Sequence, residues 1–425
     1  MPTQWIQVWS LAGVQGAITL CWVIYGAYLP KLLQQGLGIP EDAAKEMTGT
    51  LLIIENALAI LMEPLWGGLS DRLQRWVGTR MPLILAGTIL SAGLFVALPL
   101  LVVNGGNPQL LQTLLPVVAV VWSLAMTMFR SPVICMLSIF AMNTRLPQAM
   151  SILTLVGGLA GSMRFLAQGA ILGLGSLAAF AIGSGVLLGA VFLLRKMMGD
   201  FPINPAPNLQ VWAWHRYIVP LSLLLGLGLI FGWGTRLMFG EVFPRLVKTE
   251  LMPAVAGQVS FLTPELILGS LALLGAISAL AMGQLATIYP NHLLMIGSCG
   301  IIAVSMVVLM STKGLWLLCG LGLVMVFSYA AIANGGIPLA LGLLPHWGGL
   351  AIGTYFGGFG AANMSFSLLI PKPLQMITLE QSLIIAAVIF LVGGFGVAVT
   401  QRITPPLAIT EPLLKADPEA ASQDD

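Results

Sequence analysis

The chain has 425 residues, of which 58% are hydrophobic and only 8% are charged, and its formal net charge is +2. A soluble protein is about a quarter charged, so this composition excludes an ordinary soluble enzyme, and the small, scattered positive charge argues against a nucleic-acid partner. Apolar stretches of roughly twenty residues, long enough to cross a bilayer as helices, recur from end to end. We therefore predict an all-α polytopic membrane protein.

Twelve apolar segments predict twelve transmembrane helices in two groups of six. The first group lies near residues 7–29, 47–68, 82–103, 112–140, 149–174 and 176–194, and the second near 217–240, 257–286, 292–311, 314–343, 348–370 and 382–400. The domains we expect are an N-terminal six-helix bundle (1–194), a cytoplasmic linker (195–216), a C-terminal six-helix bundle (217–400) and a disordered cytoplasmic tail (401–425).

Similar stretches occur at corresponding places in the two groups, which indicates two homologous, pseudo-symmetric halves. "YLPKLLQ" (28–34) corresponds to "VFPRLVK" (242–248), and "GGLSD" (67–71) corresponds to "GQLAT" (283–287). A third pair consists of the stretches that begin "LPQAM" at 146 and "LPHWG" at 344. The three pairs occur in the same order in both halves.

Charge gathers at one place, "PLWGGLSDRLQRWVGTRMP" (64–82), between the second and third segments. A carboxylate at Asp71 can cap the N-terminus of a neighbouring helix and pair with an arginine. Such contacts form in one conformation and break in another, so we expect a conformational latch formed by Gly68, Asp71, Arg72 and Arg80. The alternative is a set of arginines that only fixes the orientation in the membrane.

Residues 67–72 with Gly78 and Arg80 resemble the signature loop G-x-x-x-D-R-x-G-R of the major facilitator superfamily. The longer spacing from "SDR" to "GTRMP" is similar to the glycoside–pentoside–hexuronide and sucrose-carrier branches of cation-coupled symporters. A related branch contains photosynthetic proteins linked to pigment and antenna assembly. The resemblance implies two six-helix bundles and the same latch role for Asp71. The counterpart "GQLATIYPNH" (283–292) has no acid, which predicts a one-sided latch.

Three ionisable residues lie deep in the predicted helices of the first half. At ~1.5 Å per residue, Glu55, Arg130 and Arg164 stand roughly 16–22 Å above the inner boundary, so we expect them to converge on a central cleft. Each would be costly against lipid. Glu55 can exchange a proton, and the excess positive charge suits an anionic substrate. The alternative is a structural ion pair between Glu55 and an arginine.

Polar and aromatic side chains complete the expected substrate site. In the superfamily, the first, fourth, seventh and tenth helices line the central path, and the resemblance implies roles for Trp22, Tyr25, Trp233 and Asn334 there. Four cysteines lie in apolar segments without CxxC spacing, and no catalytic, metal-binding or cofactor-binding motif is visible. We therefore expect no enzyme activity, no metal and no cofactor.

The function we expect is secondary active transport of a polar organic solute, a sugar or an organic anion, by alternating access and with proton coupling. Lys and Arg are more frequent in one set of loops, which predicts cytoplasmic termini in the inner membrane, and we expect a monomer. Two alternatives stay open. One is a non-transporting factor that binds pigment or aids assembly of a photosynthetic complex. The other is multidrug efflux.

Overall fold

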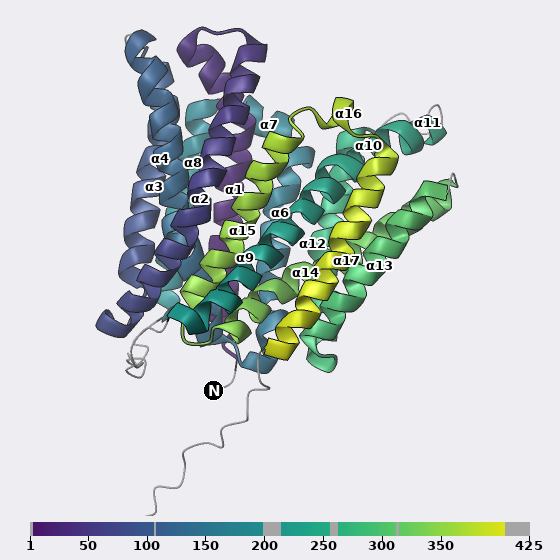
Figure 1. Cartoon of the computed structure of the whole chain (residues 1–425). Coiled ribbons are helices and arrows are strands. Elements are labelled where there is room, and N and C mark those ends of the chain that lie inside the picture. Colours follow the sequence, from purple (N-terminus) through teal and green to yellow (C-terminus); the bar gives the residue numbers. More distant parts are fainter. Residues whose placement is uncertain (1–2, 106–107, 199–213, 256–261, 312–313, 404–425) are drawn as a thin grey trace, which may run out of the picture.

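The computed structural model describes residues 3–105, 108–198, 214–255, 262–311 and 314–403, and this part of the chain is helical throughout its regular structure (Figure 1). Most of the predicted linker and nearly all of the predicted tail lie outside the described residues. Within these described ranges, eleven helices are long and apolar enough to cross a membrane. Helix α15 (Gly348–Leu369) makes the twelfth, so the fold class is the predicted one.

The N-terminal bundle contains six long helices. These are α1 (Trp5–Leu37), α2 (Glu41–Val77), α3 (Met81–Val103), α4 (Pro108–Cys135), α6 (Leu146–Leu166) and α8 (Ser176–Met198). Short helical turns connect them: α5 (Leu137–Phe140), η1 (Asn143–Arg145) and α7 (Gln168–Gly173).

The C-terminal bundle also contains six long helices. These are α9 (Trp214–Leu237), α12 (Pro264–Ile288), α13 (Asn291–Ser311), α14 (Leu315–Leu343), α15 and α17 (Leu379–Ile403). Short segments extend α9: η2 (Met238–Val242), α10 (Phe243–Leu246), η3 (Val247–Leu251) and α11 (Met252–Val255). One more turn, α16 (Pro373–Met376), precedes α17.

Helix α15 is rich in glycine and other small residues, and neighbouring helices cover much of it. It packs on α2 along one side and on α9 along another. On the side that faces α2, a glycine recurs about every four residues along the helix: Gly349, Gly353, Gly357 and Gly360. A helix surrounded by protein can carry small and polar residues, because close backbone contact replaces the apolar side chains that lipid would require.

Several helices are longer than predicted, and one is shorter. The second helix continues to Val77, where Gly78 at φ +76° ends it, so Asp71 lies inside a helix rather than in a turn. Pro30 lies within α1, which runs to Leu37 instead of ending near residue 29. The helix predicted at 149–174 ends at Leu166, and a separate turn, α7, follows it. These errors fall where helices leave the apolar layer, because hydropathy no longer marks them there.

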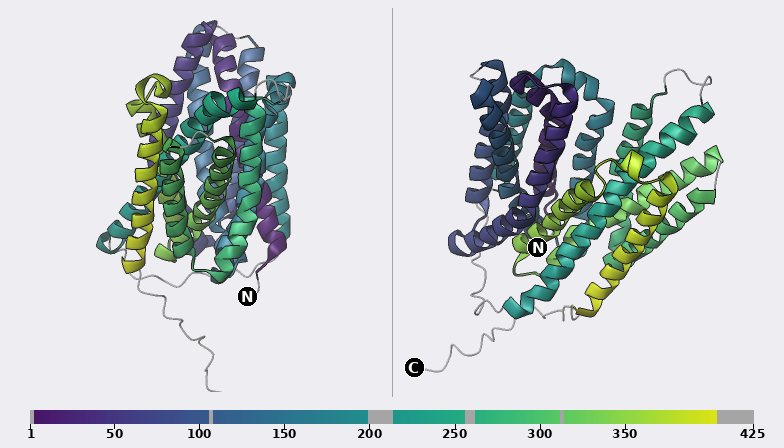
Figure 2. Two further views of the ribbon diagram at one scale, coloured as in Figure 1. Left: turned by 90° about the vertical axis from the view of Figure 1, so that its right-hand side faces the viewer. Right: turned by 45° about the horizontal axis from the view of Figure 1, so that its top comes forward.

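The bundles meet through two antiparallel pairs of helices, α2 with α15 and α6 with α12. Both pairs use small residues: Gly353 faces the backbone of Glu63 and Pro64, and Gly158 faces Ala276. Figures 1 and 2 show the ribbons of the two bundles diverging away from the end where the N-terminus lies.

Candidate functional site

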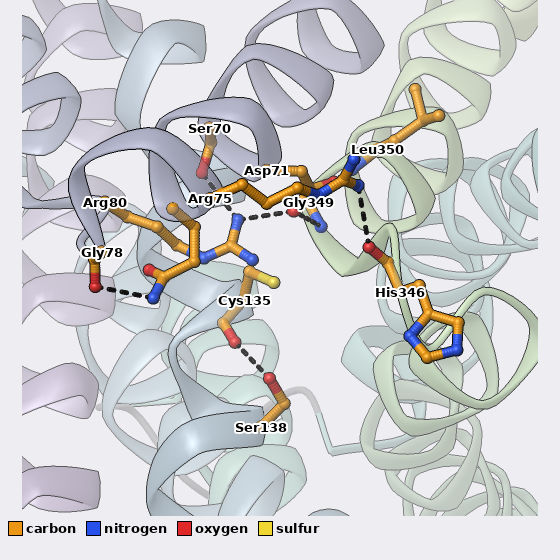
Figure 3. A network of polar contacts seen from close by, with 11 residues as sticks. Ser70, Asp71, Arg75, Gly78, Arg80, Cys135, Ser138, His346, Gly349 and Leu350 are labelled. Carbon is orange, nitrogen blue, oxygen red and sulfur yellow. Dashed lines mark hydrogen bonds and ion pairs between the residues drawn. The ribbon is translucent and has the colours of Figure 1, made fainter. Parts of the chain in front are cut away.

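The charged segment at the end of α2 bonds directly to the second bundle (Figure 3). The carboxylate of Asp71 accepts hydrogen bonds from the backbone N–H groups of Gly349 (2.9 Å) and Leu350 (2.8 Å) in the first turn of α15. Its Oδ1 atom also lies 2.6 Å from Nη1 of Arg80. A carboxylate at this position satisfies amide groups that no helical carbonyl can reach, and it faces the positive end of the helix dipole.

This contact is buried and geometrically tight, and we call Asp71, Arg80, Gly349 and Leu350 the latch. The Asp71 side chain is 0% exposed and that of Arg80 is 10% exposed. The backbones of α2 and α15 approach so closely here that a Cβ atom on Gly67 would overlap the carbonyl group of Gly349. Removing one partner of such a buried pair costs about 3–5 kcal/mol, because the other charge is left uncompensated.

Two of the residues predicted to form the latch, Gly68 and Arg72, do not make its close contacts. Arg72 is exposed, and the guanidinium bonded to Asp71 is that of Arg80. The close glycine is Gly67, whereas a Cβ atom on Gly68 would only reach ordinary contact, 3.7 Å from Leu350. Both differences have one cause: α2 is still helical here, so adjacent residues point about 100° apart.

Arg75 also contacts the second bundle, although it was not among the predicted latch residues. Its guanidinium lies 3.7 Å from the ring centroid of Trp347 and donates a hydrogen bond to the backbone oxygen of His346 (3.3 Å). Both acceptors precede α15. Arg75 follows Asp71 by one helical turn, and this i, i+4 spacing on the charged end of α2 is the signal that could have identified it.

Glu55 lies inside the N-terminal bundle, and no ion pair joins it to a cation in the part of the chain that the structure describes. Its residue is 4% exposed, and Tyr25 of α1 donates a short hydrogen bond to Oε1. Ser123 of α4 lies beside the carboxyl group, while Oε2 has no hydrogen-bond partner among the described residues. A buried carboxyl group that pairs with no cation can bind a proton without breaking an ion pair.

Arg130 pairs with a different acid from the one we considered. Its Nη1 atom lies 3.6 Å from Oε1 of Glu63, and Ser131 donates to Oε2 of the same carboxylate (2.5 Å). The guanidinium also lies 3.9 Å from the ring centroid of Phe356 on α15, so it contacts the opposite bundle. The predicted structural pair of Glu55 with an arginine is therefore replaced by Glu63 with Arg130.

Arg164 is exposed and lies in the last turn of α6, within electrostatic range of Arg236 in the last turn of α9. The structure thus divides Glu55, Arg130 and Arg164 among three sets of contacts. The position of a Cα atom along a helix does not determine where a long guanidinium side chain ends. Similar heights of the three residues in the membrane therefore did not predict which side chains pair.

The remaining predicted substrate residues differ in their surroundings. Trp22 and Tyr25 both pack on Trp122, with ring centroids 4.9 and 4.3 Å away. Trp233 donates a hydrogen bond to Ser365 on α15 (2.9 Å). Asn334 is 1% exposed and donates to the backbone oxygen of Ala279 (2.8 Å), so it ties α14 to α12.

The equivalent end of α12 carries no latch. Thr287 occupies the place of Asp71 in the repeat, and its hydroxyl donates to Gln284 of its own helix (2.7 Å). Arg145, which caps the start of α6, contributes no side-chain hydrogen bond to that helix. In the described residues, no group of three His, Cys, Asp or Glu side chains is placed to hold a metal.

Comparison with known proteins identifies the fold but not a family. No family model and no curated protein matches the sequence. The outward-facing structure of a bacterial homologue of the iron transporter ferroportin superposes with a TM-score of 0.70 at 15% identity, over 93% of this chain and 99% of that one. The human organic anion transporter MFSD10 gives 0.66 at 14% identity (93% and 100%), and the fucose:proton symporter of E. coli gives 0.66 at 13% (92% and 97%).

Proposed function

We propose that this protein is a secondary active transporter that moves a polar organic solute, a sugar or an organic anion, across the inner membrane, with both termini cytoplasmic. The observation that carries the proposal is the latch. Asp71 bonds the first turn of a helix in the other bundle, and this closure must break if the bundles are to open at the same end. Two bundles that rock about a central site are the usual basis of alternating access.

The fold comparison supports the same proposal at a coarser level. The three structures with this fold are described as an iron transporter homologue, an organic anion transporter and a fucose:proton symporter. These names differ in cargo, so the fold favours transport while the substrate class has to come from the side chains of this chain.

We propose proton coupling through Glu55, which is buried, bonded to Tyr25 and free of any ion pair within the described ranges. Glu63 is a poorer candidate, because binding a proton there would break its pair with Arg130. Arg130 also touches Phe356 of the other bundle. Rearrangement of that contact during rocking would change the surroundings of both carboxyl groups, which is what coupling requires.

Proteoliposomes that contain the pH dye pyranine test this proposal. External addition of sugars and organic anions should acidify the interior of vesicles with the wild-type protein. Glu55→Gln should abolish the acidification, whereas Glu46→Gln, an exposed acid on the same helix, should leave it unchanged. Equal proton flux in Glu55→Gln and wild type would refute the role of Glu55, and no flux of any solute would refute transport.

One observation favours a second candidate, a membrane factor that binds pigment or aids photosynthetic assembly. An open apolar groove of about 480 Å³ lies on α12, α13 and α14, and its lining includes Met282, Leu293, Ile301 and Phe327. An apolar groove of this size suits part of a hydrophobic ligand. Pigment absorbance in the purified protein, together with no solute flux in vesicles, would favour this candidate over transport.

A further inference from the structure

Two arginines from opposite bundles approach each other at the end far from the latch. Arg164 lies in the last turn of α6, which starts near the latch end, and Arg236 lies in the last turn of α9. Both residues are exposed, and the two guanidinium groups lie within electrostatic range of each other. Helix α6 packs on α1 and α12, and α9 packs on α15 and α17. The two arginines therefore belong to helices that do not pack on each other.

Neither arginine is neutralised by an acid. Among the described residues, the ion pairs are Glu41 with Lys45, Asp71 with Arg80, Glu63 with Arg130 and Glu241 with Arg245, and none includes Arg164 or Arg236. Glu241 lies within electrostatic range of Arg236. However, its carboxylate is bonded to Arg245 at 3.0 Å, and Arg245 in turn donates to the backbone oxygen of Ile377. The local excess of charge is positive.

The surroundings of the pair are aromatic. Arg236 lies 5.4 Å from the ring centroid of Phe366 on α15, and Arg164 lies 6.0 Å from that of Phe165. Trp233, one turn before Arg236, packs edge-on against Phe366 with centroids 5.1 Å apart. Guanidinium groups next to aromatic rings match a ligand that has a carboxylate at one end and an apolar body at the other.

We propose that Arg164 and Arg236 together bind the carboxylate of an organic anion with an apolar body, and that this anion draws the far ends of the two bundles together. The inference rests on the proposed function and names the substrate class of that transporter. Without a ligand, two like charges on opposite bundles repel and hold the far end apart. A carboxylate between them accepts hydrogen bonds from both guanidinium groups and converts repulsion into a bridge.

Binding measurements on the purified full-length protein in neutral detergent test the proposal. The probes are benzoate, hexanoate and glutarate, each compared with its uncharged amide, and the readout is ligand-dependent thermal stabilisation, from which an affinity follows by mass action. We expect at least one carboxylate to stabilise the wild type while its amide does not. Absence of any preference for carboxylate over amide would overturn the proposal.

Variants assign the binding to the two arginines. Arg164→Gln and Arg236→Gln should each weaken carboxylate affinity by about tenfold or more, the value of a charged hydrogen bond. The Lys variants should fall between, because they keep the charge but lose the bidentate fork. Arg195→Gln, an exposed arginine on α8, is the matched control. Unchanged affinity in both Gln variants would overturn the proposal, and since both side chains are exposed we expect the variants to fold.

A lipid phosphate is the other source of an anion at this level of a membrane protein. Nanodiscs of phosphatidylcholine alone and with phosphatidylglycerol separate the two. Carboxylate binding that persists in phosphatidylcholine discs supports the proposal, and an arginine-dependent effect seen only with phosphatidylglycerol, without carboxylate binding, overturns it. Arginine-dependent binding without flux in vesicles would refute transport alone, and flux of a neutral solute unaffected by both Gln variants would refute this inference alone.

Discussion

The two helix pairs that join the bundles are related by the internal repeat, yet among the described residues only the α2–α15 pair is bonded by a buried carboxylate at its end. Both pairs use small residues for close approach: four glycines of α15 face the backbone of α2, and Gly158, Gly269 and Gly283 bring α6 and α12 together. At the latch end, α2 adds Asp71, which bonds the first turn of α15. Its counterpart Thr287 bonds within α12.

If the bundles rock as proposed, the two interfaces should respond differently. Contacts between small residues change little with ionic conditions, since they depend on shape alone. A buried carboxylate with two amide donors and an arginine is either fully bonded or lost, because partial separation leaves an uncompensated charge. We infer that rocking opens the α2–α15 pair at the latch and keeps the α6–α12 pair in contact.

The largest effect we expect comes from Asp71→Ala, which removes every bond of the latch. Loss of about 3–5 kcal/mol of contact energy should raise the population open at this end by a hundredfold or until it saturates. Cys135 is a native reporter, because it is buried and lies 2.9 Å from the place of a Cβ atom on Gly348. Its rate of alkylation by a maleimide, measured in a Cys319→Ser background, should rise accordingly.

The matched control for that measurement is Asp42→Ala, an exposed acid at the other end of the same helix. It should leave the alkylation rate of Cys135 unchanged. If Asp71→Ala also leaves the alkylation rate unchanged while the protein stays folded, the contacts of Asp71 do not hold this end closed. The inference that the two helix pairs differ in how they open would then be wrong.

A smaller effect should separate the two glycine contacts. Gly353→Ala places a methyl group against the backbone of Glu63 and 2.9 Å from Cα of Pro64, so we expect destabilisation of about 1–3 kcal/mol. Gly158→Ala places its methyl group 2.6 Å from Cβ of Ala276, a side-chain atom. Ala276→Gly should therefore relieve Gly158→Ala, whereas no side-chain change can relieve Gly353→Ala.

Thermal unfolding in detergent measures both effects. A double-mutant cycle for Gly158→Ala and Ala276→Gly should give a favourable coupling of about 1 kcal/mol. Gly320→Ala, at a helical glycine with nothing within 4 Å, should be neutral or slightly stabilising. A stability of Gly353→Ala equal to that of Gly320→Ala would show that α2 and α15 are not in backbone contact.

The fold could be predicted from the sequence, and so could the kind of contact that Asp71 makes, a bond to an arginine and to the start of a neighbouring helix, because both follow from local patterns. Apolar segments of membrane length define the helices. The chemistry of a carboxylate at a helix end defines what Asp71 can bond, and Arg80 was within reach on the next segment. The helix carrying Asp71 extends further than predicted, because beyond the apolar layer hydropathy carries no signal for where a helix ends.

The partners of the deep charges could not be predicted in the same way. Glu55 and Glu63 lie on one helix eight residues apart, and which of them meets Arg130 depends on how α2 rotates against α4. Arg164 and Arg236 lie in different bundles, and no local sequence pattern indicates which residues of the two bundles are neighbours. The sequence identified Arg164 as important because of its depth, but gave Arg236 no role in the substrate site.

The smallest effect we expect distinguishes two arginines that the sequence presents as equals. Arg75→Ala removes a cation–π contact with Trp347 and a hydrogen bond to His346, so it should favour opening at the latch by about 0.5–1 kcal/mol. Alkylation of Cys135 should then rise about two- to fivefold. Arg72→Ala, one turn earlier and exposed, should leave the rate unchanged because its side chain does not bond Asp71. The opposite ranking would restore Arg72 as the partner of Asp71 and would leave Arg75 as a charge that only orients the protein in the membrane.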